Sequence, residues 1–183
     1  MGTTATGQRV VSDVDYLELA RSRSRAEFIA ACGFPFLLGA DTLSRPPGPQ
    51  PTVCGAEYPE LQRFLAGGPP PTLTKREKAT LLPVSKLTKA FPSMITIGRT
   101  SNHDVVLSDV EISKFHAFIR SHDKGGFELV DAGSSNGTWV GEMKLRKLVA
   151  QRLRFGEPLR FGRLRFHFLD AGACWDALRQ SQS

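Results

Sequence analysis

The chain has 183 residues, which is enough for one domain with a sizeable core and a small attachment but too few for two full-sized domains. With 40% hydrophobic and 23% charged residues, its composition is ordinary for a soluble globular protein. No stretch reaches the roughly 18 consecutive apolar residues of a membrane span. The net charge of +6 invites a nucleic-acid partner, but a basic surface attracts any polyanion, a phosphorylated protein included.

The amino terminus and the cysteines predict the compartment. The first fifteen residues lack the basic start and apolar core of a secretory signal. The cysteines, Cys32, Cys54 and Cys174, are odd in number, unrelated in spacing and without a CxxC pair or a nearby histidine pair. This pattern supports neither a disulfide framework nor a zinc site, so we expect reduced thiols, no metal and a cytoplasmic protein.

The N-terminal third shows helical patterns. Residues 13–22 place apolar side chains at helical spacing, and Ser24 and Glu27 occupy the positions of a capping box, with Gly33 as the expected helix end. The apolar stretch from Phe28 to Ala40 is predicted to be a buried helix end and turn.

Residues 59–66 could form a third short helix. The Pro-rich stretches 46–51 and 67–71 cannot continue a helix, so we expect them to be extended linkers or wrapping segments.

The pattern changes to β from about residue 72. Short apolar runs separated by turn residues predict strands at 81–84, 94–97, 105–107, 115–120, 127–130, 138–140, 159–161 and 164–169. Several of them alternate apolar and polar residues, which is the period of a strand with one buried face. Many short strands at close spacing favour an antiparallel sandwich or barrel. A short terminal helix is possible from Asp170 to Gln180.

Eight basic residues lie between positions 144 and 165, where Glu157 is the sole acidic residue. They are Lys144, Arg146, Lys147, Arg152, Arg154, Arg160, Arg163 and Arg165. The phenylalanines of this stretch fall at expected core positions, so the exposed, interleaved aromatics of a single-strand binder are missing. The sequence therefore disfavours nucleic acid and leaves open a solvated strand face or a surface for acidic partner segments.

Three polar clusters stand where loops are expected. They are Gly98-Arg99, then Ser113-Lys114-Phe115-His116, then Ser134-Ser135-Asn136-Gly137-Thr138. Loops from different strands meet at one end of a sandwich, so these clusters could converge into a donor-rich set suited to a phosphate dianion. No carboxylate pair and no nucleophile with a base is evident among them, so we expect no catalytic residue.

In their order and spacing the three clusters resemble the forkhead-associated (FHA) domain, over roughly residues 75–170. The stretches DVVLSDVEISKFHAF and DAGSSNGTWV are similar to small bacterial members without an attached enzyme. The resemblance implies a mainly β, eleven-stranded antiparallel sandwich whose apical loops bind phosphothreonine in a partner protein. We therefore expect a helical and Pro-rich extension at 1–74, an FHA domain at 75–170 and a tail at 171–183.

The resemblance also implies roles for individual residues. The expected phosphopeptide contacts are Arg99, Ser113, Lys114, Ser134, Ser135 and Asn136, and the expected architectural residues are Gly98, His116, Gly137 and Thr138. Glu111 lies in a loop that touches residues after the phosphothreonine, and we hypothesise that it disfavours an acidic residue there. The chain departs from the family after Trp139-Val140, where Gly141-Glu142 replaces the usual Asn-Gly, which puts the shape of that hairpin in doubt.

The function that follows is phosphothreonine-dependent protein interaction in Ser/Thr kinase signalling, without a cofactor. The alternative is an FHA-like scaffold or self-association module that needs no phosphate, and an enzyme ranks third. The role of residues 1–74 is open: a structural wrap, recruitment of a separate partner, or a ligand in which Thr3, Thr4 or Thr6 is phosphorylated.

Overall fold

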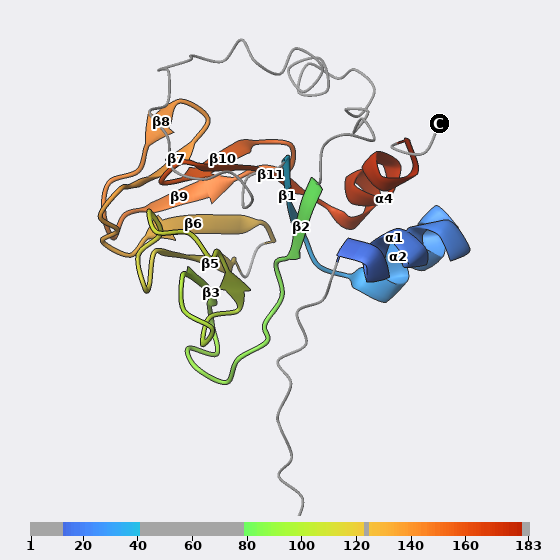
Figure 1. Cartoon of the computed structure of the whole chain (residues 1–183), viewed down its shortest axis with the longest axis horizontal. Coiled ribbons are helices and arrows are strands. Elements are labelled where there is room, and N and C mark those ends of the chain that lie inside the picture. The colour runs from blue at the N-terminus through green and yellow to red at the C-terminus, as the bar shows by residue number, and fades with distance from the viewer. Residues whose placement is uncertain (1–12, 41–78, 123–124, 181–183) are drawn as a thin grey trace, which may run out of the picture.

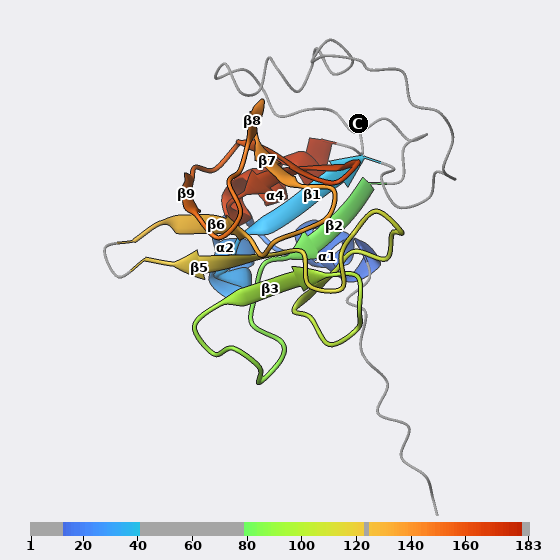
Figure 2. The same ribbon diagram turned by 90° about the vertical axis from the view of Figure 1, so that its left-hand side faces the viewer.

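The computed structural model describes residues 13–40, 79–122 and 125–180, and the architecture below refers to these residues. Two β-sheets pack face to face, and a group of helices lies beside one end of them (Figure 1). The helices are α1 (Asp13–Ser22), α2 (Arg25–Cys32) and α4 (Ala171–Gln180). Figure 2 views the sandwich from the side opposite these helices.

The first sheet has six strands and the second has five. In spatial order the first contains β2 (Ala79–Pro83), β1 (Phe36–Ala40), β11 (Leu164–Leu169), β10 (Pro158–Phe161), β7 (Thr138–Val140) and β8 (Met143–Lys144). The second contains β4 (Val105–Val106), β3 (Ile95–Gly98), β5 (Ala117–Ser121), β6 (Phe127–Asp131) and β9 (Ala150–Leu153). The mainly β, eleven-stranded sandwich expected from the sequence is therefore confirmed, with one parallel pair, β3 with β4, among antiparallel ladders.

The main core lies between the two sheets. Strand β11 shows the cause: Leu164, Phe166 and Phe168 point into this core, while Arg165 between them is exposed. Alternate side chains of a strand face opposite sides, so a period of two places one apolar set inside. Ile97 from β3 and Ile119 from β5 line the facing sheet.

A second apolar cluster joins the helices to the outer face of the six-stranded sheet. Phe36 and Leu38 of β1 and Leu169 of β11 pack there with Phe28 of α2 and Leu178 of α4. The helices therefore cover the part of this face that lies near the start of β1 and the end of β11.

Strand β1 differs from the prediction of a buried helix end and turn at 28–40. The helix end is correct, because α2 stops at Cys32 and Gly33 caps it with φ of 62°. The strand was missed because it is buried on both faces, with Leu37 in the main core and its neighbours against the helices, so no polar alternation marks it. One strand of the sandwich thus comes from the segment expected to be a helical and Pro-rich extension.

The other local predictions have mixed outcomes. The capping box of Ser24 and Glu27, the helix over Asp13–Ser22 and the terminal helix are all present. The short strands β8 and β9 were not anticipated, because their residues are largely exposed and carry no clear period. The possible helix at 59–66, the Pro-rich stretches and Cys54 lie outside the described residues.

None of the helices in the described ranges is long and apolar enough to cross a membrane. The two described cysteines, Cys32 and Cys174, are buried free thiols, and burial raises the pKa of both.

Candidate functional site

Three loops of the sandwich contact one another at the end of β11 that lies away from α4. The backbone N–H of Arg99 donates to the carbonyl of Ser113 at 3.0 Å, which joins the loop after β3 to the loop before β5. The N–H of Ser135 donates to Ser113 Oγ at 3.1 Å, and Asn136 Nδ2 donates to the carbonyl of Glu111 at 2.8 Å. The structure therefore brings together the three polar clusters that the sequence singled out.

Gly98 is required by a close backbone approach. A Cβ atom added at this position would lie 2.1 Å from the carbonyl oxygen of Lys114 and 2.5 Å from the ring of His103. The peptide N–H of Leu107 also donates to the Gly98 carbonyl at 2.9 Å. Since a backbone oxygen cannot swing aside as a side chain can, a glycine here lets the first two loops meet.

Arg99 presents its guanidinium at the surface. The residue is exposed, and its guanidinium makes a long hydrogen bond of 3.5 Å from Nη1 to the carbonyl of Val110. A bond at this distance restrains the side chain weakly. The planar donor fork of Arg99 is thus available for an anionic ligand.

Ser113, Lys114 and Ser135 surround the same junction. Ser113 Oγ accepts the Ser135 amide, so the hydroxyl proton of Ser113 remains free to donate to a ligand. Lys114 and Ser135 are exposed. Together with Arg99 they supply a guanidinium, an ammonium and hydroxyl donors at one loop junction.

His116 connects the second and third loops through hydrogen bonds. It is fully buried; its Nδ1 accepts the N–H of Ser113 at 3.1 Å, and its Nε2–H donates to the carbonyl of Gly137 at 3.0 Å. Burial lowers the pKa of His116, although the bond to Gly137 and the charge of Asp131 oppose this. A neutral ring with both nitrogens occupied positions the loops and has no capacity left for proton transfer to a ligand.

Asp131, which the sequence analysis did not single out, organises the third loop. Its Oδ1 accepts the N–H groups of Gly133 and Ser134, and its Oδ2 accepts the hydroxyls of Ser134 and Thr138, both at 2.6 Å. Burial alone would raise the pKa of Asp131, but these hydrogen bonds outweigh it and lower the pKa. A carboxylate three residues before a Ser-Ser-Asn-Gly turn is the signal that could have revealed this role.

Ser134 differs from its predicted role as a phosphopeptide contact. Its side chain is buried, and its hydroxyl donates to Asp131 and accepts the N–H of Gly137 at 2.9 Å. The single O–H donor of Ser134 is therefore used inside the loop. Thr138 is buried in the same way, whereas Ser135 and Asn136 face outward.

Gly137 completes the turn with φ of 88°, a left-handed conformation that costs glycine little. A Cβ atom here would lie 2.7 Å from Cε of Lys144 and 2.9 Å from the ring of Trp139. The turn predicted from Asn136-Gly137 is therefore packed closely against side chains of β7 and β8.

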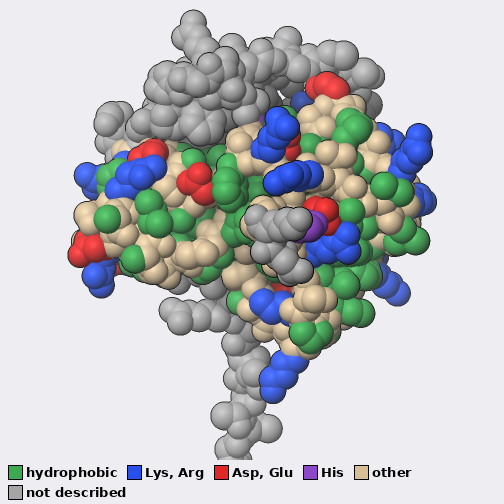
Figure 3. Space-filling view, turned by 180° about the vertical axis from the view of Figure 1, so that it is seen from behind, with side chains coloured by type: hydrophobic (Ala, Val, Ile, Leu, Met, Phe, Trp, Pro, Cys, Tyr) green, Lys and Arg blue, Asp and Glu red, His purple; other side chains and the backbone are tan. Residues whose placement is uncertain are grey.

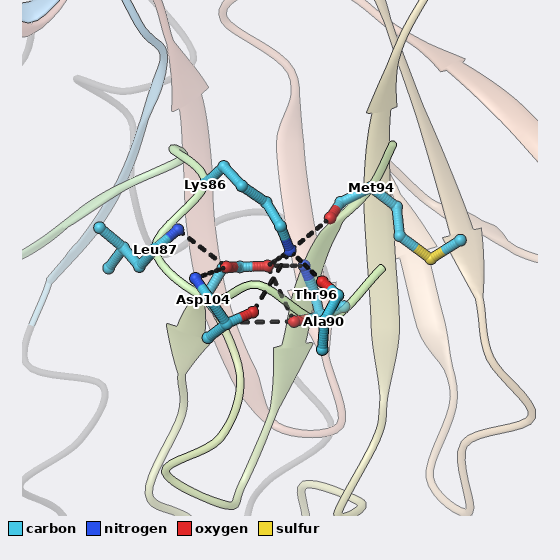
Figure 4. A network of polar contacts seen from close by, with 7 residues as sticks. Lys86, Leu87, Ala90, Met94, Thr96 and Asp104 are labelled. Atoms are coloured by element: carbon cyan, nitrogen blue, oxygen red, sulfur yellow. Dashed lines mark hydrogen bonds and ion pairs between the residues drawn. The ribbon is translucent and has the colours of Figure 1, made fainter. Parts of the chain in front are cut away.

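Asp104 anchors the base of the first loop through a polar network that the sequence analysis also missed (Figure 4). Its carboxylate accepts Lys86 Nζ at 2.8 Å, the hydroxyl and N–H of Thr96, and the amides of Leu87 and Thr88. Burial by itself would raise the pKa of Asp104, but these donors hold it far below its usual range. The sequence gives no local signal for this network, because the partners of Asp104 lie up to 18 residues away.

Glu111 lies on the second loop, beside the turn between β10 and β11. Its N–H donates to Asp109 Oδ1 at 2.9 Å, and Asp109 in turn pairs with Arg163. Glu111 is partly exposed and its carbonyl holds Asn136. The loop that carries the hypothesised specificity residue is thus fixed from both sides.

The described residues contain no group of three or more His, Cys, Asp or Glu side chains placed to hold a metal ion. One surface hollow of about 460 Å³ lies away from the three loops, and it is lined by Phe127, Phe155 and Phe168 with Arg152 and Arg154. The loop junction is an exposed surface of hydrogen-bond donors, and its arrangement fits a ligand that arrives from outside.

The described residues thus form a two-sheet β-sandwich in which three loops with many hydrogen-bond donors meet, which is an architecture of binding domains. The sequence model of the family described as FHA domain matches residues 95–162, so this chain contains an FHA domain there. The match spans β3 to the turn after β10 and includes all three loop clusters.

Curated relatives match about two fifths of the chain. Identity is 39% over 74 residues with the oxoglutarate dehydrogenase inhibitor of Corynebacterium glutamicum, covering 40% of this chain and 49% of that protein. It is 38% over 72 residues with the glycogen accumulation regulator GarA of Mycolicibacterium smegmatis, covering 39% of this chain and 43% of that protein. The chain spans about half the length of the curated relatives it matches.

Two solved structures illustrate the comparison of folds. The FHA domain of CT664 from Chlamydia trachomatis matches with a TM-score of 0.44 and 20% identity, covering 74% of this chain and 97% of that one. EmbR of Mycobacterium tuberculosis, in complex with a low-affinity phosphopeptide, matches with a TM-score of 0.42 and 26% identity, covering 50% of this chain and 22% of that one.

Proposed function

We propose that this chain is a phosphothreonine-dependent protein-interaction module that acts in Ser/Thr kinase signalling in the cytoplasm and is not an enzyme. The observation that carries the proposal is the junction of Arg99, Ser113 and Ser135, where one hydrogen-bonded frame exposes a guanidinium, a free hydroxyl proton and a polar turn. A phosphorylated side chain brings a charge of about −1.5 to −2 and three acceptor oxygens. Its chemistry complements this frame.

Each proposed ligand residue has a separate task. Arg99 would pair with two phosphate oxygens, Ser113 would donate its hydroxyl proton, and Lys114 would add an ammonium at the rim. Asn136 is exposed and donates Nδ2 to the Glu111 carbonyl, and its side-chain oxygen would accept a peptide N–H. In this proposal Ser134 supports the loop and leaves ligand contact to Ser135.

The same geometry argues against catalysis at this junction. His116 is neutral, buried and engaged at both ring nitrogens, so it does not act as a general base for Ser113. The carboxylate of Asp131 accepts four hydrogen bonds inside the loop and is equally engaged. A ligand at this site would be held and released unchanged.

Fluorescence anisotropy with matched phosphothreonine and unphosphorylated peptides tests the proposal, using ligands selected from a phosphothreonine peptide library. Arg99→Ala removes at least one hydrogen bond to a charged group, worth about 1.5 to 3 kcal/mol, so we expect affinity to fall about tenfold to a hundredfold. Ser113→Ala is expected to weaken binding in the same direction. Arg154→Ala is the matched control, because this exposed arginine lies after β9, away from the three loops.

A lysate pull-down with and without phosphatase treatment separates the proposal from its alternative. A partner retained equally well after phosphatase treatment, and by Arg99→Ala, would select the phosphate-independent scaffold or self-association module. Loss of the partner in both cases supports phosphothreonine recognition.

A further inference from the structure

A row of side chains with three cations and one indole crosses the outer face of the six-stranded sheet beside the candidate site. The strand register places Lys144 opposite Trp139, Trp139 opposite Arg160, and Arg160 opposite Arg165, across β8, β7, β10 and β11 (Figure 1). We call these four residues the basic row. Neighbouring strands lie about 4.8 Å apart, so the row is about 14 Å long.

The row faces outward because the residues beside it face inward. Leu159 and Phe161 flank Arg160 in the chain and are buried in the core between the sheets. Leu164 and Phe166 do the same on either side of Arg165. Since helices α1, α2 and α4 cover another part of this face, the basic row occupies the part that they leave open.

The cations of the row have no ion-pair partner among the residues that the structure describes. No carboxylate among the described residues lies within ion-pair distance of Lys144, Arg160 or Arg165. Burial and the charge of Arg165 lower the pKa of Arg160, and the charge of Glu142 only partly offsets this. Like charges placed directly opposite in a sheet repel each other, so an anion lying across the row would relieve an unfavourable contact.

Trp139 organises the row geometrically. The guanidinium of Arg160 lies 3.3 Å from the centre of the indole, and Lys144 Nζ lies 5.2 Å from it. Cations over an aromatic face are held by its quadrupole, which leaves their outward N–H groups free to bind. The other tryptophan has a single cation near it, Arg179 at 5.5 Å from the ring centre of Trp175, whereas Trp139 has two. On the face that Figure 3 shows, Lys and Arg side chains lie at several separate places.

The row is continuous with the phosphate site. Lys144 Cε packs against Gly137, which lies two residues after Ser135. On the other side, Arg160 Nη1 donates to the carbonyl of Gly162 at 3.3 Å, and the N–H of Gly162 donates to the carbonyl of Gly137. The basic row therefore begins directly beside the three loops, so a partner segment bound at the loops can continue onto the row.

We propose that the basic row is a second docking surface, which binds an acidic segment of the same partner protein that presents the phosphothreonine. This inference deepens the proposed function and rests on it. An extended chain advances roughly 3.3 Å per residue, so about five acidic residues cover the row. The row selects partners in which an acidic run accompanies the phosphorylated residue, and the loops alone bind the phosphate.

Peptides that differ only in their acidic run test the inference. A phosphothreonine peptide is joined by a Gly-Ser spacer to about five glutamates or five glutamines, placed before or after the phosphorylated residue. We expect the glutamate peptide to bind about fivefold to tenfold more tightly than the glutamine peptide in one of the two placements at low ionic strength. The advantage should shrink as salt is added, because the cations are exposed.

Two double variants with the same change in charge identify the surface. Arg160→Gln with Arg165→Gln should abolish the glutamate advantage and leave binding of the glutamine peptide unchanged. Arg152→Gln with Arg154→Gln, on β9 and just after it in the other sheet, should keep the advantage. Equal loss in both variants would mean that net charge alone attracts the acidic run, and would overturn the inference.

Trp139 provides a direct readout. In a Trp175→Phe background it is the one remaining tryptophan, so its emission should shift when the glutamate peptide binds and stay constant when the glutamine peptide binds. No shift at saturation would overturn the inference. Tighter binding of a short DNA duplex than of the glutamate peptide, lost with Arg160 and Arg165, would also overturn it and assign the row to nucleic acid.

Failure of the proposed function has a different signature. If no peptide binds better with phosphate than without it, the phosphothreonine proposal fails. Unphosphorylated glutamate and glutamine peptides at low salt, compared between the two double variants, then still show whether the row binds an acidic run.

Discussion

Replacing Asp131 by alanine should destabilise the third loop, because it removes the acceptor of four hydrogen bonds there. The carboxylate is buried and accepts hydrogen bonds from the hydroxyls of Ser134 and Thr138 and from two backbone amides. Without it, two buried hydroxyls lose their acceptor, and each unsatisfied buried donor costs about 1 to 3 kcal/mol. Allowing for relaxation of the loop, we expect a loss of about 3 to 4 kcal/mol in the free energy of unfolding, a large share of typical domain stability.

Urea unfolding at pH 7, followed by circular dichroism and tryptophan fluorescence, measures this loss. Glu128→Ala is the matched control on the same strand, because Glu128 forms an ion pair with the exposed Arg120. A surface pair of this kind contributes about 0 to 1 kcal/mol. Phosphopeptide binding by Asp131→Ala, measured where the variant is still folded, should also be weaker than in the control, since the Ser134 to Gly137 contact depends on the same carboxylate.

The reasoning would be refuted if Asp131→Ala lost no more stability than Glu128→Ala. Asp131→Asn refines the test. The amide keeps one oxygen that can accept hydrogen bonds, but it replaces the other oxygen with an NH₂ group, which faces N–H and O–H donors and cannot accept from them. The asparagine variant should therefore lie between the parent and the alanine variant. A loss in the asparagine variant equal to that in the alanine variant would assign the effect to the negative charge.

Two further predictions concern backbone approach and pH. Gly98→Ala should abolish peptide binding and lower the melting temperature, because the new Cβ would lie 2.1 Å from the Lys114 carbonyl; unchanged calorimetric binding would contradict this. Burial lowers the pKa of His167 to about 4, so the unfolded state binds more protons than the folded state once pH falls below about 6.5. The free energy of unfolding should therefore fall between pH 6.5 and 4, by at most about 1.4 kcal/mol per pH unit for this group, and His167→Gln should flatten that slope in urea titrations.

Much of the fold could be predicted because its signals are local. The capping box at Ser24 and the glycine stop at Gly33 depend on residues a few positions apart, and both are present. Strand β11 was visible from its alternating residues, since one of its faces is buried between the sheets. Strand β1 gave no such signal because both of its faces are buried.

The sequence predicted the residue types of the candidate site but not which of its side chains are buried and which are exposed. Ser134 and Ser135 are adjacent and chemically identical, yet one is buried against Asp131 and the other faces outward. A motif cannot separate them, because the direction of each side chain depends on how the turn packs. Asp104 escaped notice for a related reason: its lysine partner, Lys86, is 18 residues away.

The amino-acid sequence by itself determined the class of this protein, its strands with one buried face, the excess of basic charge and the three clusters of hydrogen-bond donors. Only the tertiary structure decided which residues of those clusters are exposed, which are buried, and how the basic residues line up. Lys144, Trp139, Arg160 and Arg165 are up to 26 residues apart in number and become a single row through strand register. Register is set by burying one face of each strand against the core, and that choice involves every strand of the sheet at once.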